Sequence, residues 1–252
     1  MEIDGKIFIV TGAASGLGQG TAEMLAAAGG QVVVADMQEH LGMNVAHRVG
    51  GAFVKCDVSD EADVARVVRL ACSMGKLMGV VNCAGIAPAH KTVGGAEPHP
   101  LSLFSKTVAV NLTGTFNVIR LAAAAMSRNQ PEATGERGCI VSTASVAAYE
   151  GQIGQAAYSA SKGGIVAMTL PIARDLARVG IRNMTIAPGI FGTPMLFSMP
   201  KDVQDALAAS VPFPSRLGTP SDYARLVRHI FENDMLNGEV IRLDGGIRMP
   251  PR

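Results

Sequence analysis

Residues 6–18 read KIFIVTGAASGLG, an apolar run that passes directly into a glycine-rich segment. The apolar run predicts a buried strand, and GQGTAEMLAAAG at 18–29 predicts the helix that follows it. Glycines in the turn between them let the backbone close tightly and let a phosphate group approach it. Three occur here: Gly12, Gly16 and Gly18. Although the spacing is GxxxGxG rather than the general GxGxxG, the strand–turn–helix context predicts a pyrophosphate-binding unit.

The same alternation of short apolar strands and helices continues along the chain. Further strands are predicted at 31–36, 52–58, 78–85, 138–145, 181–189 and 239–245, and further helices near 38–48, 60–73, 101–128, 152–178 and 220–232. Strands that alternate with helices form a parallel sheet covered on both faces. We therefore expect a single α/β domain over residues 1–252, with a doubly wound Rossmann fold and a parallel sheet of about seven strands. The polar segment 86–100 is expected to be a loop within it.

The composition argues against several classes of function. The chain is 48% hydrophobic with a formal net charge of +1, so no basic field recruits nucleic acid. The four scattered cysteines predict reduced thiols, and the five histidines lack metal-ligating spacing, which predicts no metal site. We find no apolar run long enough to span a bilayer, and MEIDGKIFIVTG enters the first strand too soon for a signal peptide. We expect a cytoplasmic protein, with a mitochondrial location left open for a eukaryotic source.

Asp36 stands at the end of the second predicted strand. A carboxylate there can accept hydrogen bonds from both hydroxyls of an adenosine ribose, and it repels a 2′-phosphate. The residues that would have to be basic to relieve this repulsion are Ser15 and Met37. The sequence therefore predicts NAD rather than NADP as the cofactor.

Tyr158 and Lys162 lie four positions apart in QAAYSASKGG, residues 155–164. On a helix this spacing places both side chains on one face. A free tyrosine has a pKa of about 10, and a neighbouring ammonium lowers it, so the pair can act as a general acid and base. Ser142, Thr143 and Ser145 end the fifth predicted strand, at the sheet edge where such folds bind ligands. Asn111, within the long predicted helix 101–128, needs a polar partner.

Together these motifs resemble the motif series of the short-chain dehydrogenase/reductase family. The series comprises TGAASGLG (11–18), NCAG (82–85), NLTG (111–114), Ser145, YSASK (158–162) and PG (188–189). The resemblance implies that Tyr158 exchanges a proton with the substrate oxygen and that Ser145 hydrogen-bonds the same oxygen. It implies that Lys162 lowers the Tyr158 pKa and holds the nicotinamide ribose. Asn111 is expected to bind a water that links Lys162 to solvent.

The resemblance also implies which residues contact the cofactor. Cys83 is expected to make a backbone contact rather than thiol chemistry. The full expected set is Gly12, Ser15, Gly16, Leu17, Gly18, Asp36, Asp57, Val58, Cys83, Ala84, Gly85, Tyr158, Lys162, Phe191 and Thr193.

Stretches outside the general motifs resemble the 3-hydroxyacyl-CoA dehydrogenases of that family. They are residues 143–176, 211–218 and 236–249. This resemblance implies oxidation of an L-3-hydroxyacyl-CoA thioester with NAD, with Ser145, Gln152 and Tyr158 touching the substrate. It implies a substrate lid at about 194–214 and a homotetramer. Two alternatives stay open: a hydroxysteroid or other secondary-alcohol dehydrogenase, and a non-enzymatic binding or structural subunit.

Overall fold

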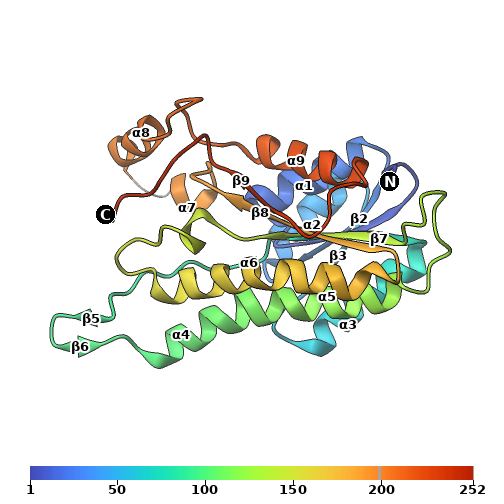
Figure 1. The fold of residues 1–252 in the computed structure, drawn as a ribbon, viewed down its shortest axis with the longest axis horizontal. Helices are drawn as coiled ribbons and strands as arrows, with labels where there is room; N and C mark the ends of the chain where they lie inside the picture. Colours follow the sequence, from blue (N-terminus) through green and yellow to red (C-terminus); the bar gives the residue numbers. More distant parts are fainter. Residues whose placement is uncertain (198–199, 252) are drawn as a thin grey trace.

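A parallel sheet runs through the middle of the molecule (Figure 1). Its seven strands lie in the order β3-β2-β1-β4-β7-β8-β9. The bounds are β1 Ile7–Thr11, β2 Gln31–Asp36, β3 Ala52–Lys55, β4 Leu77–Asn82, β7 Gly138–Thr143, β8 Ile181–Pro188 and β9 Val240–Leu243. The computed structural model describes residues 1–197 and 200–251. Residues 198 and 199 of the expected lid, and residue 252 of the expected domain, lie outside the described residues. The predicted doubly wound α/β fold is confirmed.

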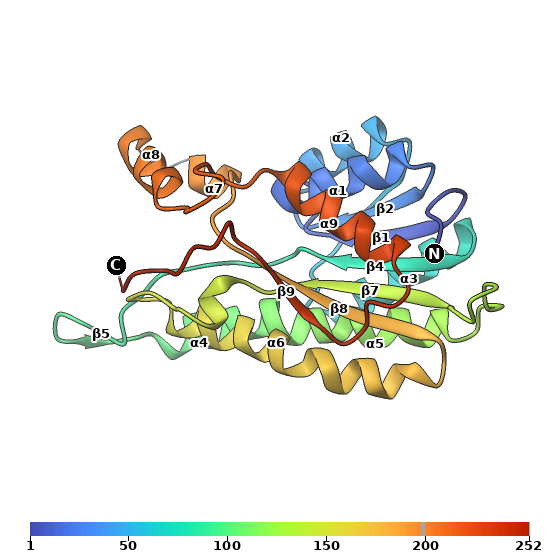
Figure 2. The same ribbon diagram turned by 45° about the horizontal axis from the view of Figure 1, so that its top comes forward.

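Helices cover both faces of the sheet (Figure 2). One face carries α1 (Gly16–Ala27), α2 (Glu39–Arg48) and α9 (Pro220–Glu232). The other carries α3 (Glu61–Met74), α4 (Leu101–Val108), α5 (Gly114–Met126) and α6 (Ala156–Ala177). The central strands are buried on both sides, which explains why β1, β4 and β7 read as continuous apolar runs rather than alternating patterns.

The strand order places the ligand-binding edge. β1 lies between β2 and β4, and the chain therefore reverses its direction of winding between β1 and β4. Ligands of such sheets bind beyond the carboxyl ends of the strands at this switch point. The segments that follow β1, β4, β7 and β8 accordingly carry the candidate site, and these are the segments that hold the sequence motifs.

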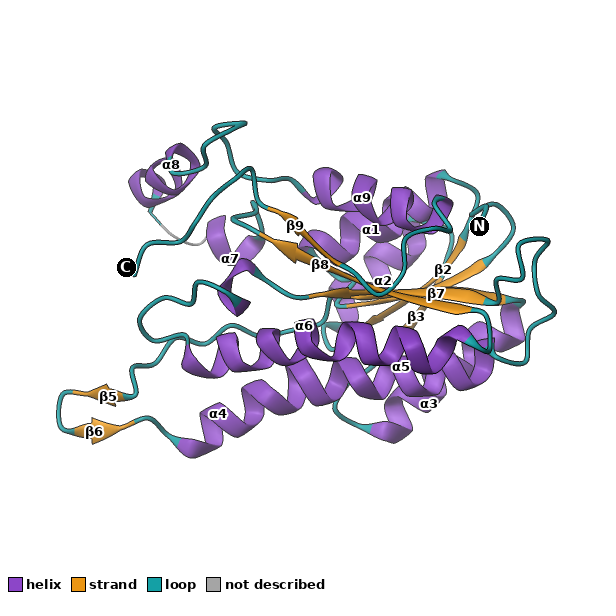
Figure 3. Ribbon diagram, viewed as in Figure 1, coloured by secondary structure: helices purple, strands orange, loops and turns teal. Residues whose placement is uncertain are grey.

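Three local features differ from the sequence expectations. The expected loop 86–100 contains a small hairpin of β5 (Val93–Gly94) and β6 (Glu97–Pro98) (Figure 3). The long helix predicted from 101 contains a π-helical turn at Ala109–Thr113 between α4 and α5. The helix predicted from 152 begins only at Ala156, because a 3-10 turn at Val146–Ala148 and a bend precede it. The expected lid contains two helices, α7 (Pro194–Phe197) and α8 (Lys201–Ala209).

The continuous helix from Leu101 to Met126 corrects a further expectation. By length and composition alone it is long and apolar enough to cross a membrane, whereas no apolar run of that length was expected. In the fold α5 packs on α3, and α4 packs on α6. Its buried side includes Asn117, whose side-chain amide donates to the Val58 carbonyl at 3.0 Å. A core helix of a covering layer passes the same test of length and composition, and this one is arranged as such a helix.

Candidate active site

The turn between β1 and α1 needs its glycines for space as well as for conformation. Gly12 has a φ of +63°, and a Cβ there would lie 2.6 Å from the Ala84 nitrogen. A Cβ on Gly18 would lie 2.3 Å from the Gly12 oxygen. Helix α1 then starts at Gly16. Its N-cap residue, Ser15, makes no side-chain capping bond, and its first turn holds no acidic residue. Its free N–H groups and positive dipole end can therefore accept an anionic pyrophosphate.

Asp36 is buried at the end of β2, on the neighbouring strand. Each carboxylate oxygen accepts one backbone N–H at 2.9 Å, from Ala14 and from Gln38. These two bonds fix the carboxylate in one orientation, and each oxygen keeps a lone pair for a further donor. The residue is thus prepared to receive the two hydroxyls of a ribose.

A long cleft joins these two features. Twelve of the expected cofactor contacts line it, together with Met37, Gln38, Cys56, Ile86, Lys106 and Val110, which the motifs did not indicate. The expected residues are Gly12, Ser15, Gly16, Leu17, Gly18, Asp36, Asp57, Val58, Cys83, Ala84, Gly85 and Thr193. The uncapped helix terminus and the oriented carboxylate fit a dinucleotide with an unmodified ribose. Phe191 lines the neighbouring cleft, which also contains Thr193, and its expected contact with the cofactor stays a prediction.

Asn111 lies in the π-helical turn and is completely buried. Its Oδ1 accepts the Ile86 N–H at 2.8 Å, and its Nδ2 donates to the Ile86 oxygen at 2.8 Å and to Ser161 Oγ at 3.0 Å. The side chain therefore clamps the segment after β4 to helix α6. The π turn is the local distortion that carries Asn111 to this position, as such turns do at functional sites. The expected water relay stays a prediction.

Lys162 is buried beneath the end of β7. Its Nζ donates to the Thr143 carbonyl at 2.7 Å and lies 5.7 Å from the centre of the Tyr158 ring. Because burial disfavours the charged amine, the pKa of Lys162 falls to about 8. The pair predicted from the sequence is therefore present, and its lysine is anchored by Thr143, the last residue of β7.

The Tyr158 pKa changes in the direction opposite to the one expected. Burial raises the pKa of the phenol, and a hydrogen bond with the Ser145 hydroxyl opposes that rise. The sequence prediction considered only the Lys162 charge and did not include the cost of burying a phenolate. The protein alone therefore keeps Tyr158 protonated at neutral pH, which is the form that can donate a proton to a carbonyl oxygen.

A second cleft opens beside Tyr158 and Ser145. Ser145 begins the turn after β7 and accepts the Ala147 N–H at 3.1 Å, which fixes its hydroxyl at the cleft. Gln152 lines the same cleft, as expected for a substrate contact. The other lining side chains are mostly apolar: Val146, Ala147, Ile190, Phe191, Leu196, Leu207 and Met249, with Gln155, Gly189 and Thr193. Leu196 and Leu207 come from α7 and α8, so the described part of the expected lid does border the site.

Sequence reasoning missed a buried polar group behind Lys162. Thr143 Oγ1 lies 2.7 Å from the Tyr223 hydroxyl and 3.5 Å from Cys83 Sγ. Burial raises the pKa of both the Cys83 thiol and the Tyr223 phenol, so both stay neutral. This agrees with the expectation that Cys83 performs no thiol chemistry. Tyr223 comes from α9, and no local motif in that helix relates it to the site.

Comparison with known proteins gives a consistent result. A family model described as enoyl-(acyl carrier protein) reductase matches residues 12–248. The chain is 55% identical to 3-hydroxyacyl-CoA dehydrogenase type-2 of Bos taurus over 99% of this chain and 98% of that protein. It is 53% identical to the Drosophila melanogaster protein of the same name, over 99% and 100% of the two chains. The crystal structure of 3-hydroxyacyl-CoA dehydrogenase type-2 from Mycobacterium avium superimposes with a TM-score of 0.94 at 40% identity, covering 98% and 97% of the two chains.

Proposed function

Because the chain belongs to the short-chain dehydrogenase/reductase family, we propose that it is an NAD-dependent oxidoreductase that interconverts L-3-hydroxyacyl-CoA and 3-oxoacyl-CoA. One observation carries the proposal: Ser145 and Tyr158 meet at the wall of an apolar cleft, with Lys162 held beneath them. The relatives with more than half their residues identical have that substrate class in their names. We also propose a homotetramer of this chain.

The choice of NAD follows from Asp36. Its carboxylate is buried and held by two backbone donors, so it cannot turn away from a nearby group. A 2′-phosphate there would meet a negative charge at close range, and neither Met37 nor Gln38 offers a compensating cation. A ribose with free hydroxyls can instead donate hydrogen bonds to the two carboxylate oxygens of Asp36.

The residues divide the chemistry among them. When bound, NAD supplies the ring that accepts or gives a hydride. Tyr158 gives its proton to the carbonyl oxygen during reduction and takes it back from the alcohol during oxidation. Ser145 holds the same oxygen and stabilises the Tyr158 phenolate by hydrogen bonding. Lys162, whose pKa is about 8, adds a positive charge behind the phenol and can pass a proton onward.

The proposed substrate matches the two kinds of surface at the site. The apolar side chains of Leu196, Leu207 and Met249 can bury an acyl chain next to Tyr158. A shallower recess lies nearby between the 86–100 loop and residues 151–156, and Lys91 lines it. The loop is held there by the His90 N–H, which donates to the Gly154 oxygen at 2.8 Å. A polar CoA group can use this recess, and its binding energy then orients the reacting carbon.

The same apolar cleft also supports the steroid alternative. A flat hydrophobic molecule with a secondary alcohol can be buried by the side chains that would bury an acyl chain. A non-enzymatic role is less well supported, because a binding protein has no need of a buried lysine and a phenol aligned with Ser145.

The experiment compares three carbonyl compounds at fixed NADH. The purified protein is given acetoacetyl-CoA, free acetoacetate and a ketosteroid, and NADH consumption is followed. We expect the thioester to have the highest kcat/KM. If the ketosteroid had a much higher kcat/KM than the thioester, the steroid alternative would replace the proposal, and if no compound were reduced, the enzymatic proposal would fail.

A further inference from the structure

Two segments that are far apart in the sequence contact each other and both contribute to the substrate cleft. The first is the Ser145 loop, residues 145–153, which carries Ser145 and Gln152. The second is the C-terminal strap, residues 244–251, which carries Met249. The strap leaves β9 through Gly245 and Gly246, and its Ile247 is buried. Residues beyond Ile247 form no helix or strand up to residue 251, so their position depends on what holds them.

Three backbone-level contacts attach the strap to the loop. The Met249 N–H donates to Glu150 Oε2 at 3.3 Å, and Gln152 Nε2 donates to the Pro250 oxygen at 3.2 Å. The Ile153 N–H donates to the Pro251 oxygen at 3.0 Å. Glu150, which accepts the first of these bonds, is fixed to the 3-10 turn that follows Ser145. Its own N–H donates to the Val146 oxygen at 2.9 Å.

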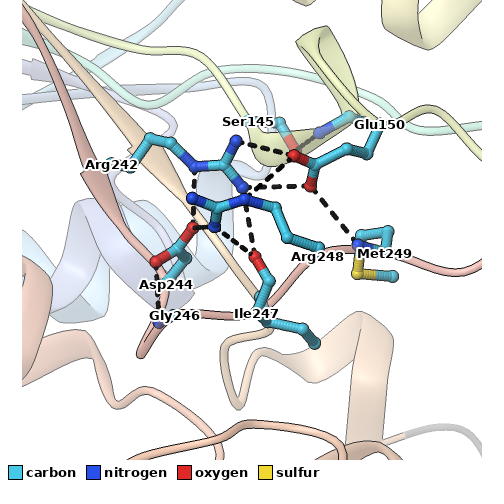
Figure 4. Close-up of polar contacts among 9 residues, drawn as sticks. Ser145, Glu150, Arg242, Asp244, Gly246, Ile247, Arg248 and Met249 are labelled. Carbon is cyan, nitrogen blue, oxygen red and sulfur yellow. Dashed lines mark hydrogen bonds and ion pairs between the residues drawn. The ribbon is translucent and has the colours of Figure 1, made fainter.

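Glu150 also forms a two-pronged ion pair with Arg242 of β9 (Figure 4). Arg242 Nη1 lies 2.8 Å from Oε1, and Nη2 lies 3.0 Å from Oε2. The same guanidinium donates through Nε to Asp244 at 2.8 Å and through Nη2 to the Ile247 oxygen at 3.1 Å. Only about a fifth of each partner is exposed, 22% of Arg242 and 23% of Glu150. One side chain thus fixes the loop and the first half of the strap together.

The geometry makes this pair stronger than an ordinary surface salt bridge. A fork-to-fork arrangement gives two parallel charge-assisted hydrogen bonds and fixes direction as well as distance. Consistent with this, Arg242 holds the pKa of the Glu150 carboxyl below its usual range. Arg248 also approaches Glu150 and Asp244, but 61% of its side chain is exposed, so solvent screens its contribution.

We propose that the Glu150–Arg242 pair is a positioning element that holds Met249 against the Ser145 loop and so sets the width of the acyl part of the cleft. The inference rests on the proposed function for the identity of the substrate. Glu150 and Arg242 do not line the cleft, so they act through Met249 and the loop rather than on the reacting atoms. The pair therefore governs the binding of the acyl chain and its length preference, while proton transfer by Tyr158 is left intact.

The test variant is Glu150→Gln, which keeps the shape and one acceptor but removes the charge. We expect KM for acetoacetyl-CoA to rise about tenfold, the loss typical of a charge-assisted hydrogen bond, with kcat changed less than about threefold. KM for 3-oxodecanoyl-CoA should rise less, because a longer chain makes further contacts of its own. Preference for the short thioester therefore falls. NADH affinity should be unchanged, since the cofactor cleft lies elsewhere.

Further variants separate positioning from general stability. Arg242→Gln should raise KM to the same extent, and the double variant should be no worse than either single one. Glu150→Asp keeps the charge, so it should raise KM for acetoacetyl-CoA less than Glu150→Gln does. Arg228→Gln is the matched control, because it breaks an exposed pair with Glu232 on the outside of α9. Amide hydrogen exchange of the segment 245–251 should accelerate in Glu150→Gln and not in the control.

If Glu150→Gln does not fold, Met249→Ala tests the same wall directly and should shift the length preference in the same direction. Unchanged KM and unchanged length preference in the folded variants would overturn the inference. So would a parallel loss of kcat, NADH affinity and melting temperature, which indicates a merely structural pair. Failure of the proposed function is distinguishable: the wild-type protein would then use another alcohol, and the same KM comparison would be made with that compound.

Discussion

The positive charge of Lys162 is destabilised by burial, and the site makes use of this. Lys162 is buried, its pKa falls to about 8, and its ammonium is held by the Thr143 carbonyl at 2.7 Å. A group with such a pKa can gain and lose a proton near neutral pH, which an exposed lysine cannot do. Tyr158 is affected in the complementary way, since burial raises its pKa and keeps it protonated. The two shifts together leave a proton donor ready for carbonyl reduction.

The first prediction for a single residue concerns Tyr158→Phe, which removes the hydroxyl and keeps the ring. We expect kcat to fall by about 10²- to 10⁴-fold, the usual contribution of a general acid, while NADH binding is retained. Steady-state kinetics and a fluorescence titration with NADH measure the two effects. Tyr149→Phe is the control, because that tyrosine is half exposed and lies outside both clefts. Near-normal turnover by Tyr158→Phe would show that another group supplies the proton.

The second prediction concerns cofactor choice. In the double variant Asp36→Asn/Met37→Arg the negative charge is lost and a cation is added, while one acceptor oxygen stays for the backbone donors. We expect the ratio of kcat/KM for NADP to that for NAD to rise about 100-fold, or about 3 kcal/mol, a repulsion reasonable for like charges near a surface. A melting curve checks that the fold is kept. A wild-type enzyme that already worked better with NADP would refute the role given to Asp36.

Some properties of the site residues could be predicted from the sequence, and others depend on the folded structure. The types and order of the site residues could be predicted, because motifs report identity and spacing. The direction of the Tyr158 pKa shift could not, because it depends on burial. Arg242 and Glu150 could not be paired either, since their contact joins β9 to a loop 92 positions earlier and no local pattern links them.

At the scale of elements, the regular parts of the fold followed from apolar patterns and caps. The predicted α9 bounds, 220–232, match the structure, and a capping box at Thr219 and Asp222 explains the sharp start. The β5–β6 hairpin and the π turn at Ala109–Thr113 were missed. Two-residue strands have no periodicity to read, and a π turn adds one residue to a helix without changing its composition.

Asp222 provides the prediction at this scale. It accepts bonds from the Thr219 hydroxyl and N–H and from Arg216 and Arg225, and Arg216 above all holds its pKa well below its usual range. Asp222→Asn should lower the free energy of unfolding at pH 7 by about 1–3 kcal/mol. The pKa of Asp222 in the folded protein is lower than its value of about 3.9 in the unfolded chain, so the carboxylate stabilises the fold fully above that pH. This stabilisation is lost progressively as the pH falls from about 3.9 through the folded pKa.

Denaturant unfolding at pH 7 and pH 3 measures the effect, and the difference between wild type and variant should be smaller at pH 3. Glu232→Gln on the same helix is the control, because its pair with Arg228 is exposed and should contribute less than about 0.5 kcal/mol. A wild-type-like stability of Asp222→Asn at pH 7 would rule out the role of this carboxylate in starting α9.

At the level of the whole molecule, the outer faces of α5 and α6 carry features that fit the proposed assembly. Phe116 on α5 and Leu170 on α6 are large apolar side chains that are nearly half exposed. Ala122 and Ala123 of α5 are buried in the core, whereas Ala124 and Ala125 are not and allow another helix to approach closely. β9 stands at the edge of the sheet, where an unpaired strand is usually covered. These features fit contacts with further copies of the chain.

We therefore expect light scattering at micromolar concentration to give four times the chain mass of 26.1 kDa. Phe116→Asp should reduce the mass, because a buried unpaired charge is costly at a helix–helix interface. Lys201→Asp, an exposed change in α8 away from that face, serves as the control for mass. A monomer mass for the wild-type protein would reject the assembly.

The proposed activity can be tested by the oxidation of the two enantiomers of 3-hydroxybutyryl-CoA, each with NAD and with NADP, measured as the appearance of the reduced cofactor. We expect rapid oxidation of the L enantiomer with NAD, slow or undetectable oxidation of the D enantiomer, and poor use of NADP because of the Asp36 carboxylate. Oxidation of the D enantiomer alone, a preference for NADP, or no oxidation of either thioester would contradict it.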